Sequence, residues 1–178
     1  MKILFIHNHY QLQSGEAQVF ESDREAAQYA GHEVVTYTRD NRELDDYGPL
    51  RRLTLGPRTS WAWDTQRELS RVIERERPSI VHVVNTLPLI SPAAFWTCKR
   101  YKLPVVYSVH NYRLACPAAT FLRAGAACTE CPDHGLVRGV IHGCYRDSRA
   151  ASLAVAAATQ LHRSLGTYAG AVLSLIHI

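Results

Sequence analysis

The chain has 178 residues, of which 47% are hydrophobic and 20% are charged, and its 20 basic and 16 acidic side chains give a formal net charge of +4. A chain of this length can form one domain that buries about 70% of the surface exposed in its unfolded state. The composition excludes a disordered chain, no apolar run approaches the roughly 18 residues of a membrane-spanning helix, and the modest charge argues against a nucleic-acid-binding protein.

The first segment, MKILFIHNHY, is a short apolar run with polar residues directly after it. One lysine precedes the run and no small-residue cleavage site follows it, so we expect a first strand rather than a signal peptide. This expectation places the protein in the cytoplasm.

Strand and helix patterns then alternate. Residues 2–7 predict a buried strand, residues 16–32 predict a helix that ends at Gly31, and residues 33–38 predict a second strand. Residues 39–57 are polar and rich in turn signals, and they predict a long surface loop.

The same alternation continues after this loop. Residues 60–77 predict a helix with Leu69, Val72 and Ile73 on one face, and residues 79–84 predict a third strand.

Ser91 and Pro92 provide a cap and a first turn for a helix over residues 93–102, and residues 104–110 predict a fourth strand. Apolar strands separated by helices predict an α/β fold with a doubly wound parallel sheet of the Rossmann-like type. Ligands of such sheets bind beyond the carboxyl ends of the strands.

Asn or His directly follows the last apolar residue of three predicted strands, so polar groups should gather at one edge of the sheet. For each residue alone, the ordinary preference of Asn and His for turns and helix caps stays open as the explanation. A dinucleotide fingerprint needs three spaced glycines in the first strand-to-helix turn, and this turn offers Gly15 alone. Gly15 precedes a helix amino terminus, where backbone amides and the helix dipole favour an anion such as phosphate.

Five segments together resemble the amino-terminal domain of family 4 glycosyltransferases: MKILFIHNHYQ, SGEAQVFESD, GHEVVTYTR, PSIVHVVNTLPLISPA and PVVYSVHNYRLACPAATFLRAG. The resemblance extends from residue 1 to about residue 172 and rests on the order and spacing of the segments. It implies the first half of a GT-B architecture, in which two Rossmann-like domains face a cleft. This domain would hold the acceptor, and a donor-binding domain absent from this chain would hold the nucleotide sugar. Transfer would retain the anomeric configuration and need no catalytic metal.

The resemblance also implies site residues. Gly15 corresponds to a glycine that lies against the donor diphosphate, and Ser14 stands where many relatives have a second glycine, which predicts a stiffer loop. His110 corresponds to a histidine that points into the cleft, where it could donate to phosphate oxygens or organise the acceptor hydroxyl. His110 is therefore the predicted catalytic residue, with a structural hydrogen bond to neighbouring backbone as the alternative. The other predicted substrate-binding residues are Asn8, Tyr10, Glu16, Asn85, Thr86, Asn111, Tyr112 and Arg113.

Among these residues, Asn85 and Arg113 rank first. The guanidinium of Arg113 offers a fork suited to phosphate or carboxylate. An ordinary ion pair with one of the acidic side chains stays open as the alternative.

Residues 116–144 form a cysteine-rich insertion that holds four of the five cysteines: Cys116, Cys128, Cys131 and Cys144. The two-residue gap within the CTEC segment lets both thiolates reach one tetrahedral zinc ion. A zinc ion with four protein ligands would be structural, and a redox pair or four unrelated thiols stay open. Cys98 lies apart on a predicted helix and is expected to be a small buried hydrophobe.

Residues 144–166 predict an alanine-rich helix that ends at Gly166. Four of its residues are spaced four apart and are expected in the core: Leu153, Ala157, Leu161 and Leu165. A basic flank could instead face anionic lipid at the inner face of a membrane, although basic flanks are usually solvated: Arg138, His142, Arg146 and Arg149.

The last residues, LSLIHI, are what one reading frame of a common sequencing-library adapter, CTGTCTCTTATACACATCT, encodes. We therefore expect a domain over residues 1–172 and a non-native tail over residues 173–178. The alternative is that residues 173–176 form a genuine apolar strand.

These observations predict a fragment of a hexosyltransferase that is inactive alone. The full-length protein would transfer a sugar from a nucleotide-sugar donor to a saccharide or lipid-linked acceptor hydroxyl, with no nucleic acid as a partner. The alternative is a non-catalytic, zinc-stapled module that binds an anionic ligand at Gly15 and His110.

Overall fold

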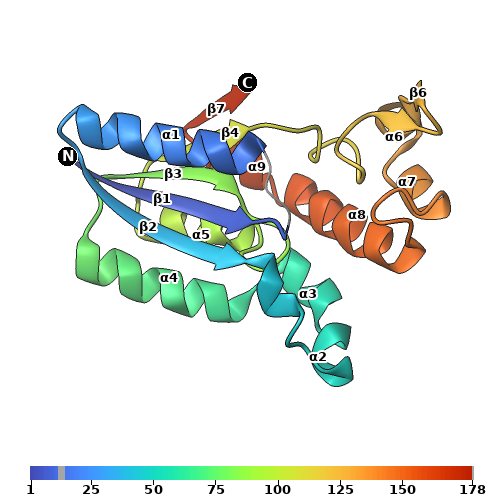
Figure 1. Cartoon of the computed structure of the whole chain (residues 1–178), viewed down its shortest axis with the longest axis horizontal. Helices are drawn as coiled ribbons and strands as arrows, with labels where there is room; N and C mark the ends of the chain where they lie inside the picture. Colours follow the sequence, from blue (N-terminus) through green and yellow to red (C-terminus); the bar gives the residue numbers. More distant parts are fainter. Residues whose placement is uncertain (12–14, 178) are drawn as a thin grey trace.

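The computed structural model describes residues 1–11 and 15–177, and its centre is a five-stranded sheet (Figure 1). The strands are β1 (Lys2–His9), β2 (Glu33–Asp40), β3 (Ile80–Asn85), β4 (Val105–Val109) and β7 (Ser174–His177). Their order is β2-β1-β3-β4-β7, and every neighbouring pair is parallel. The predicted parallel, Rossmann-like α/β fold is confirmed. The chain moves outward from β1 to β2 and then crosses back to β3, so the strand order reverses between β1 and β3.

Helices cover the two faces of the sheet (Figure 1). Helix α1 (Gly15–Tyr29) lies on one face, where its Phe20 packs with Phe5 and Val84. Helices α4 (Trp63–Glu76) and α5 (Ala93–Arg100) lie on the opposite face over the larger core cluster. The predicted apolar face of α4 is confirmed, because Leu69 and Ile73 are buried and Val72 is partly buried in this cluster.

The predicted surface loop over residues 39–57 is wrong. This segment contains the 3-10 helix η1 (Asn41–Leu44) and helix α2 (Pro49–Leu53), and it leads directly into α3 (Leu55–Ser60). Two residues begin these helices: Asp40 caps η1 by accepting from the Arg42 amide at 2.8 Å, and Pro49, part of a Gly-Pro turn signal, occupies the first turn of α2.

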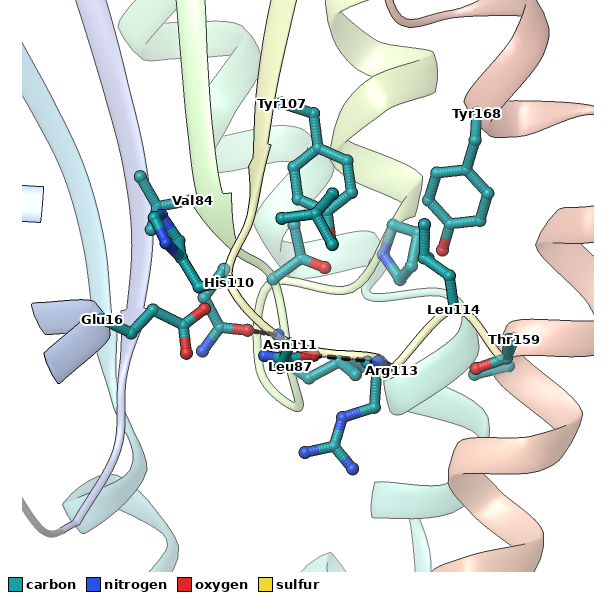
Figure 2. A pocket seen from close by; sticks show the side chains of 15 residues that line it. Glu16, Val84, Leu87, Tyr107, His110, Asn111, Arg113, Leu114, Thr159 and Tyr168 are labelled. Carbon is teal, nitrogen blue, oxygen red and sulfur yellow. Dashed lines mark hydrogen bonds between the residues drawn. The ribbon is translucent and has the colours of Figure 1, made fainter. Parts of the chain in front are cut away.

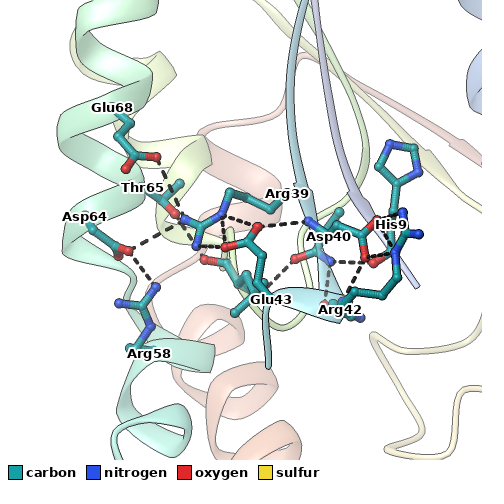
Figure 3. A network of polar contacts seen from close by, with 12 residues as sticks. His9, Arg39, Asp40, Arg42, Glu43, Arg58, Asp64, Thr65 and Glu68 are labelled. Atoms are coloured by element: carbon teal, nitrogen blue, oxygen red, sulfur yellow. Dashed lines mark hydrogen bonds and ion pairs between the residues drawn. The ribbon is translucent and has the colours of Figure 1, made fainter. Parts of the chain in front are cut away.

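An ion-pair network fixes this segment against α4 (Figure 3). The Arg39 side chain is only 11% exposed and lies 2.6 Å from Glu43, 3.6 Å from Asp64 and 3.8 Å from Glu68. Arg58 on α3 reaches the same Asp64 carboxylate at 2.6 Å. Because Asp64 is shared, α3 and the end of β2 are held to the start of α4.

After β4 the chain forms a small subregion and then returns to the sheet. Its elements are β5 (Leu122–Arg123), β6 (Ala126–Ala127), α6 (Glu130–His134), α7 (Val137–Ile141), α8 (Arg149–Ser164) and α9 (Thr167–Gly170). Strand β7 then pairs with β4. The proposed adapter origin of residues 173–178 stays a prediction, and Ile178 lies outside the described residues.

The predicted core stripe of α8 is wrong, because the helix is rotated from the expected orientation. Leu153, Leu161 and Leu165 are 57%, 41% and 45% exposed. The buried face carries mainly small or polar side chains: Ser152, Val155, Ala156, Ala158, Thr159 and His162. Small side chains let α8 approach α3 and α7 closely. His162 satisfies both ring nitrogens, with the Thr167 hydroxyl at 2.9 Å and the Ser60 carbonyl at 2.8 Å.

Candidate functional site

A pocket lies beyond the carboxyl ends of β3 and β4, beside the first turn of α1 (Figure 2). Six predicted site residues line it together: Glu16, Asn85, Thr86, His110, Asn111 and Arg113. They come from the first turn of α1, from the end of β3 and the loop after it, and from the loop after β4. The strand order reverses at this edge between β1 and β3. Ligands of open α/β sheets bind at such a reversal. The pocket therefore occupies the position that the topology favours for a ligand.

The loop after β4 carries His110, Asn111 and Arg113. The Arg113 amide donates to the Asn111 side-chain oxygen at 3.0 Å, which holds the loop in a tight turn beside the pocket. The Arg113 guanidinium donates to the Pro117 carbonyl and lies 4.8 Å from the centre of the Tyr145 ring. Arg113 is thus a fixed cation at the wall of the pocket, held by backbone and ring contacts.

Glu16 faces this loop from the first turn of α1 (Figure 2). Burial raises the pKa of the Glu16 carboxyl to about 7, although a hydrogen bond from Tyr10 and the charge of Arg113 act in the opposite direction. Burial likewise raises the pKa of Tyr10 to about 12, and Tyr10 also bonds to the Arg113 side chain. Tyr10, Glu16 and Arg113 therefore form one polar group, and its carboxyl can gain or lose a proton near neutral pH.

The Glu16→Gln variant should gain stability relative to the wild type as the pH rises. The folded-state pKa of Glu16 lies above its ordinary value of 4.5, so the carboxyl favours folding most when it is protonated, and this contribution is lost as the pH rises through about 7. We expect similar melting temperatures for the two proteins near pH 4.5 and a variant that melts a few degrees higher near pH 8. Thermal unfolding measures this difference. A difference in melting temperature that stays the same at pH 4.5 and pH 8 would contradict the raised pKa of Glu16.

Asn8 and Asn85 connect the strand ends beneath the pocket. The Asn85 side chain donates to the Asn8 carbonyl at 2.7 Å and accepts from the Leu87 amide at 3.1 Å. Asn8 is fully buried, and its side chain donates to Asn41 at 2.8 Å and accepts from the Leu89 amide at 2.9 Å. Asn8 does not line the pocket. The side chains of Asn8 and Asn85 both hold the backbone at the strand ends in place. Their predicted contact with substrate stays a prediction.

Two other predicted residues lie at the margin of the site. Gly15 begins α1, and apart from its chain neighbours and the backbone of its own helix no described atom lies within 4 Å of the position that a Cβ would occupy. Backbone amides at such a helix end favour an anion. Ser14, with its expected effect on this loop, lies outside the described residues. Tyr112 is 46% exposed, and its ring packs 4.6 Å from Phe121 rather than lining the pocket.

The sequence did not predict several residues of the site. Tyr107, Thr159 and Tyr168 line the far wall of the pocket, and the rings of the two tyrosines stack 6.1 Å apart. His7 does not line the pocket; it is fully buried, and the centre of its ring lies 4.7 Å from that of Phe20. Burial lowers the pKa of His7 to about 3, with contributions from nearby His9 and His110. His7 is therefore neutral near pH 7. The apolar run of residues 2–7 predicted the strand that contains His7. No sequence pattern indicated that α8 and α9 fold back beside β4.

The four clustered cysteines lie near one another as free thiols. Burial raises the pKa of Cys131 and Cys144, and the neighbouring cysteines add to both shifts. Within residues 1–11 and 15–177, no three His, Cys, Asp or Glu side chains are arranged to hold a metal ion. Zinc binding by these cysteines stays a prediction, which the metal content of the purified protein tests. Cys98 is fully buried, and burial raises its pKa to about 12, which confirms the expected buried hydrophobe.

Comparison with known proteins gives one match. A family profile described as Glycosyltransferase Family 4 matches residues 16–130, which is more than half of the chain and includes the loops after β3 and β4. No curated protein and no solved structure matches the chain.

Proposed function

Because the chain belongs to glycosyltransferase family 4, we propose that it forms the acceptor-side domain of an enzyme that transfers a sugar from a nucleotide-sugar donor to an acceptor hydroxyl with retention of configuration. In this proposal the domain is the first half of a GT-B enzyme that works in the cytoplasm. In this proposal the donor nucleotide is held mainly by a second Rossmann-like domain.

The observation that carries the proposal is the placement of the pocket. Glu16, Thr86 and His110 reach it from three different segments at the edge of the sheet where the strand order reverses. Such an edge is where a Rossmann-like domain presents side chains to a ligand. A second domain facing this edge would close a cleft over the same residues.

We assign His110 the central role in the transfer. The acceptor oxygen forms a bond to the anomeric carbon, the bond from that carbon to the diphosphate breaks, and the acceptor proton leaves with the nucleoside diphosphate. Negative charge develops on the departing diphosphate, so a hydrogen-bond donor fixed beside it stabilises the transition state. His110 would supply this donor, and the backbone amides at Gly15 would receive the diphosphate at the start of α1.

Glu16, Tyr10 and Arg113 would bind the acceptor. Glu16 and Arg113 line the pocket and Tyr10 lies close to both, which supports a site with a donor, an acceptor and a cation. Such a set suits a saccharide hydroxyl or the phosphate of a lipid-linked acceptor. We propose no catalytic metal, and we propose any bound zinc as a structural ion of the residue 116–144 insertion.

The proposal is tested with the reading frame recovered beyond codon 172 from independently prepared DNA. We expect that frame to encode a second α/β domain. The longer protein should release nucleoside diphosphate from one member of a panel of nucleotide sugars in the presence of saccharide acceptors. The 178-residue chain is the matched control and should show no transfer.

A frame that ends again with LSLIHI and a stop codon would contradict the proposal. The non-catalytic binding module would then be the better description. In that case phosphate should bind the 178-residue chain and protect it against thermal unfolding, and the His110→Ala variant should lose this protection.

A further inference from the structure

Two leucines of α2 are among the most exposed apolar side chains of the protein. Leu50 is 82% exposed and Leu53 is 77% exposed, and none of the residues of this helix is buried. Arg51 and Arg52 lie between them, and the Arg51 guanidinium is placed 3.9 Å from the centre of the Tyr47 ring. Helix α2 therefore presents apolar and cationic side chains to the solvent in one turn.

Helix α8 lies at the same end of the molecule as α2 (Figure 1). It also carries exposed apolar side chains. Its exposed residues are Leu153, Leu161 and Leu165. Helix α3 connects the two, because it follows α2 directly and packs along α8. An open groove between α3 and α8 is lined by small and apolar residues, among them Gly56, Pro57 and Leu153. We call this the α2–α8 surface, and it comprises Leu50, Leu53, Leu153, Leu161 and Leu165 with Arg51, Arg52, Arg149 and Arg163.

The charge of this region has one sign. The sequence contains no Asp or Glu in residues 48–63 and none in residues 148–178. Arg58 is neutralised by Asp64 at 2.6 Å, but Arg51, Arg52 and Arg163 make no ion pair with any described residue. Arg149 donates to the Ile141 carbonyl at 3.2 Å and keeps its positive charge. Asp45, Asp46 and Asp147 lie only at the margins of the two segments.

The structure changes which basic residues are available to contact anionic lipid. In the flank suggested by the sequence, His142 lies 3.4 Å from Glu130 and Arg146 donates to Gln11 at 3.3 Å. Arg149 of that flank lies on α8 with the exposed leucines, and Arg51 and Arg52 lie between Leu50 and Leu53 on α2. The cationic and apolar groups therefore coincide on the α2–α8 surface.

We infer that the α2–α8 surface docks onto an anionic membrane. Exposed leucines can enter the boundary between headgroups and acyl chains, while arginines beside them contact anionic headgroups. No described helix is both long and apolar enough to cross a bilayer, so the inference concerns a peripheral contact. It does not depend on the proposed transferase function, because the residues of the surface lie outside the pocket at the strand ends.

The test is sedimentation of the 178-residue protein with vesicles of phosphatidylcholine alone and with vesicles that also contain phosphatidylglycerol. We expect binding to the anionic vesicles only, and weaker binding at high salt. The Arg51→Ser/Arg52→Ser variant should bind about 30-fold more weakly, since each basic residue near an anionic surface contributes on the order of a factor of five. The Leu50→Ser/Leu53→Ser variant should lose at least about tenfold.

Two matched controls separate the surface from general effects of charge and hydrophobicity. Arg67→Ser/Arg71→Ser removes two exposed arginines from α4, and Leu122→Ser removes a leucine of β5 that is 58% exposed. Both controls should bind like the wild type, and circular dichroism melting should show that all variants fold. Equal sedimentation with both vesicle types, or unchanged binding of the α2 variants, overturns the inference. A dimer that the Leu50→Ser/Leu53→Ser variant dissolves also overturns it, because a second copy would then cover the surface.

Discussion

Replacing His110 with alanine should lower the rate of sugar transfer by about 100- to 1000-fold in the protein that includes the donor-binding domain. His110 follows β4 directly and lines the pocket with Glu16 and Arg113, so the substitution removes the side chain to which we assign the central role in the proposed transfer. A donor aimed at developing charge contributes more in the transition state than in the ground state. We therefore expect a loss in kcat with a smaller change in KM.

The matched control for this prediction is His32→Ala. His32 precedes β2 at the opposite, amino-terminal edge of the sheet, so its removal should leave transfer unchanged. His110→Gln, which keeps a side-chain donor, should retain more activity than His110→Ala. A His110→Ala enzyme that transfers sugar within a few-fold of the wild-type rate would exclude this role for His110.

Replacing Asn8 with alanine should cost about 3 kcal/mol of folding free energy, although Asn8 does not line the pocket. The Asn8 side chain is fully buried and connects three segments: it accepts from the Leu89 amide, donates to Asn41 and donates to the His9 carbonyl. Alanine would leave the Leu89 amide and the buried Asn41 side chain without these partners, and each unsatisfied buried group costs roughly 1–3 kcal/mol. For a chain of this size the melting temperature should fall by about 10 °C.

Denaturant unfolding measures this loss, and Asn111→Ala provides the comparison. Asn111 is partly exposed and holds one backbone amide, that of Arg113, so its removal should cost about 1 kcal/mol or less. If the two variants were equally stable, the hydrogen bonds of Asn8 would not hold the strand ends together.

The sheet and the position of the site could be predicted from the sequence because both depend on local patterns. Strands buried on both faces read as continuous apolar runs, and the parallel order then places the loops after them at one edge. The choice of Glu16, Thr86 and His110 as site residues came from the resemblance to family 4 glycosyltransferases, and the structure places all three at the pocket. The family assignment confirmed the resemblance carried by the same segments.

The errors have physical causes in particular residues. Residues 39–57 were predicted as a loop because the segment is polar and contains Gly-Pro turn signals, yet Pro49 of one such signal begins the short helix α2. The predicted orientation of α8 was wrong because leucines spaced four apart suggest a core face. In the structure this helix buries alanine, serine and a hydrogen-bonded His162 instead. Thr159 and Tyr168 line the pocket through contacts between distant parts of the chain, which no local pattern encodes.

Strand β7 lies at the end of the sheet, paired with β4 on one side and with no other described strand on its second side. Apolar side chains in β7 and directly before it are accessible to solvent: Leu173 is 73% exposed, Leu175 is 48% exposed and Ile176 is 41% exposed. An open strand with unpaired amides and carbonyls can template the addition of a strand from another molecule. We therefore expect concentrated preparations of this chain to aggregate edge to edge, and Leu175→Lys should improve solubility more than an equal charge added on α1.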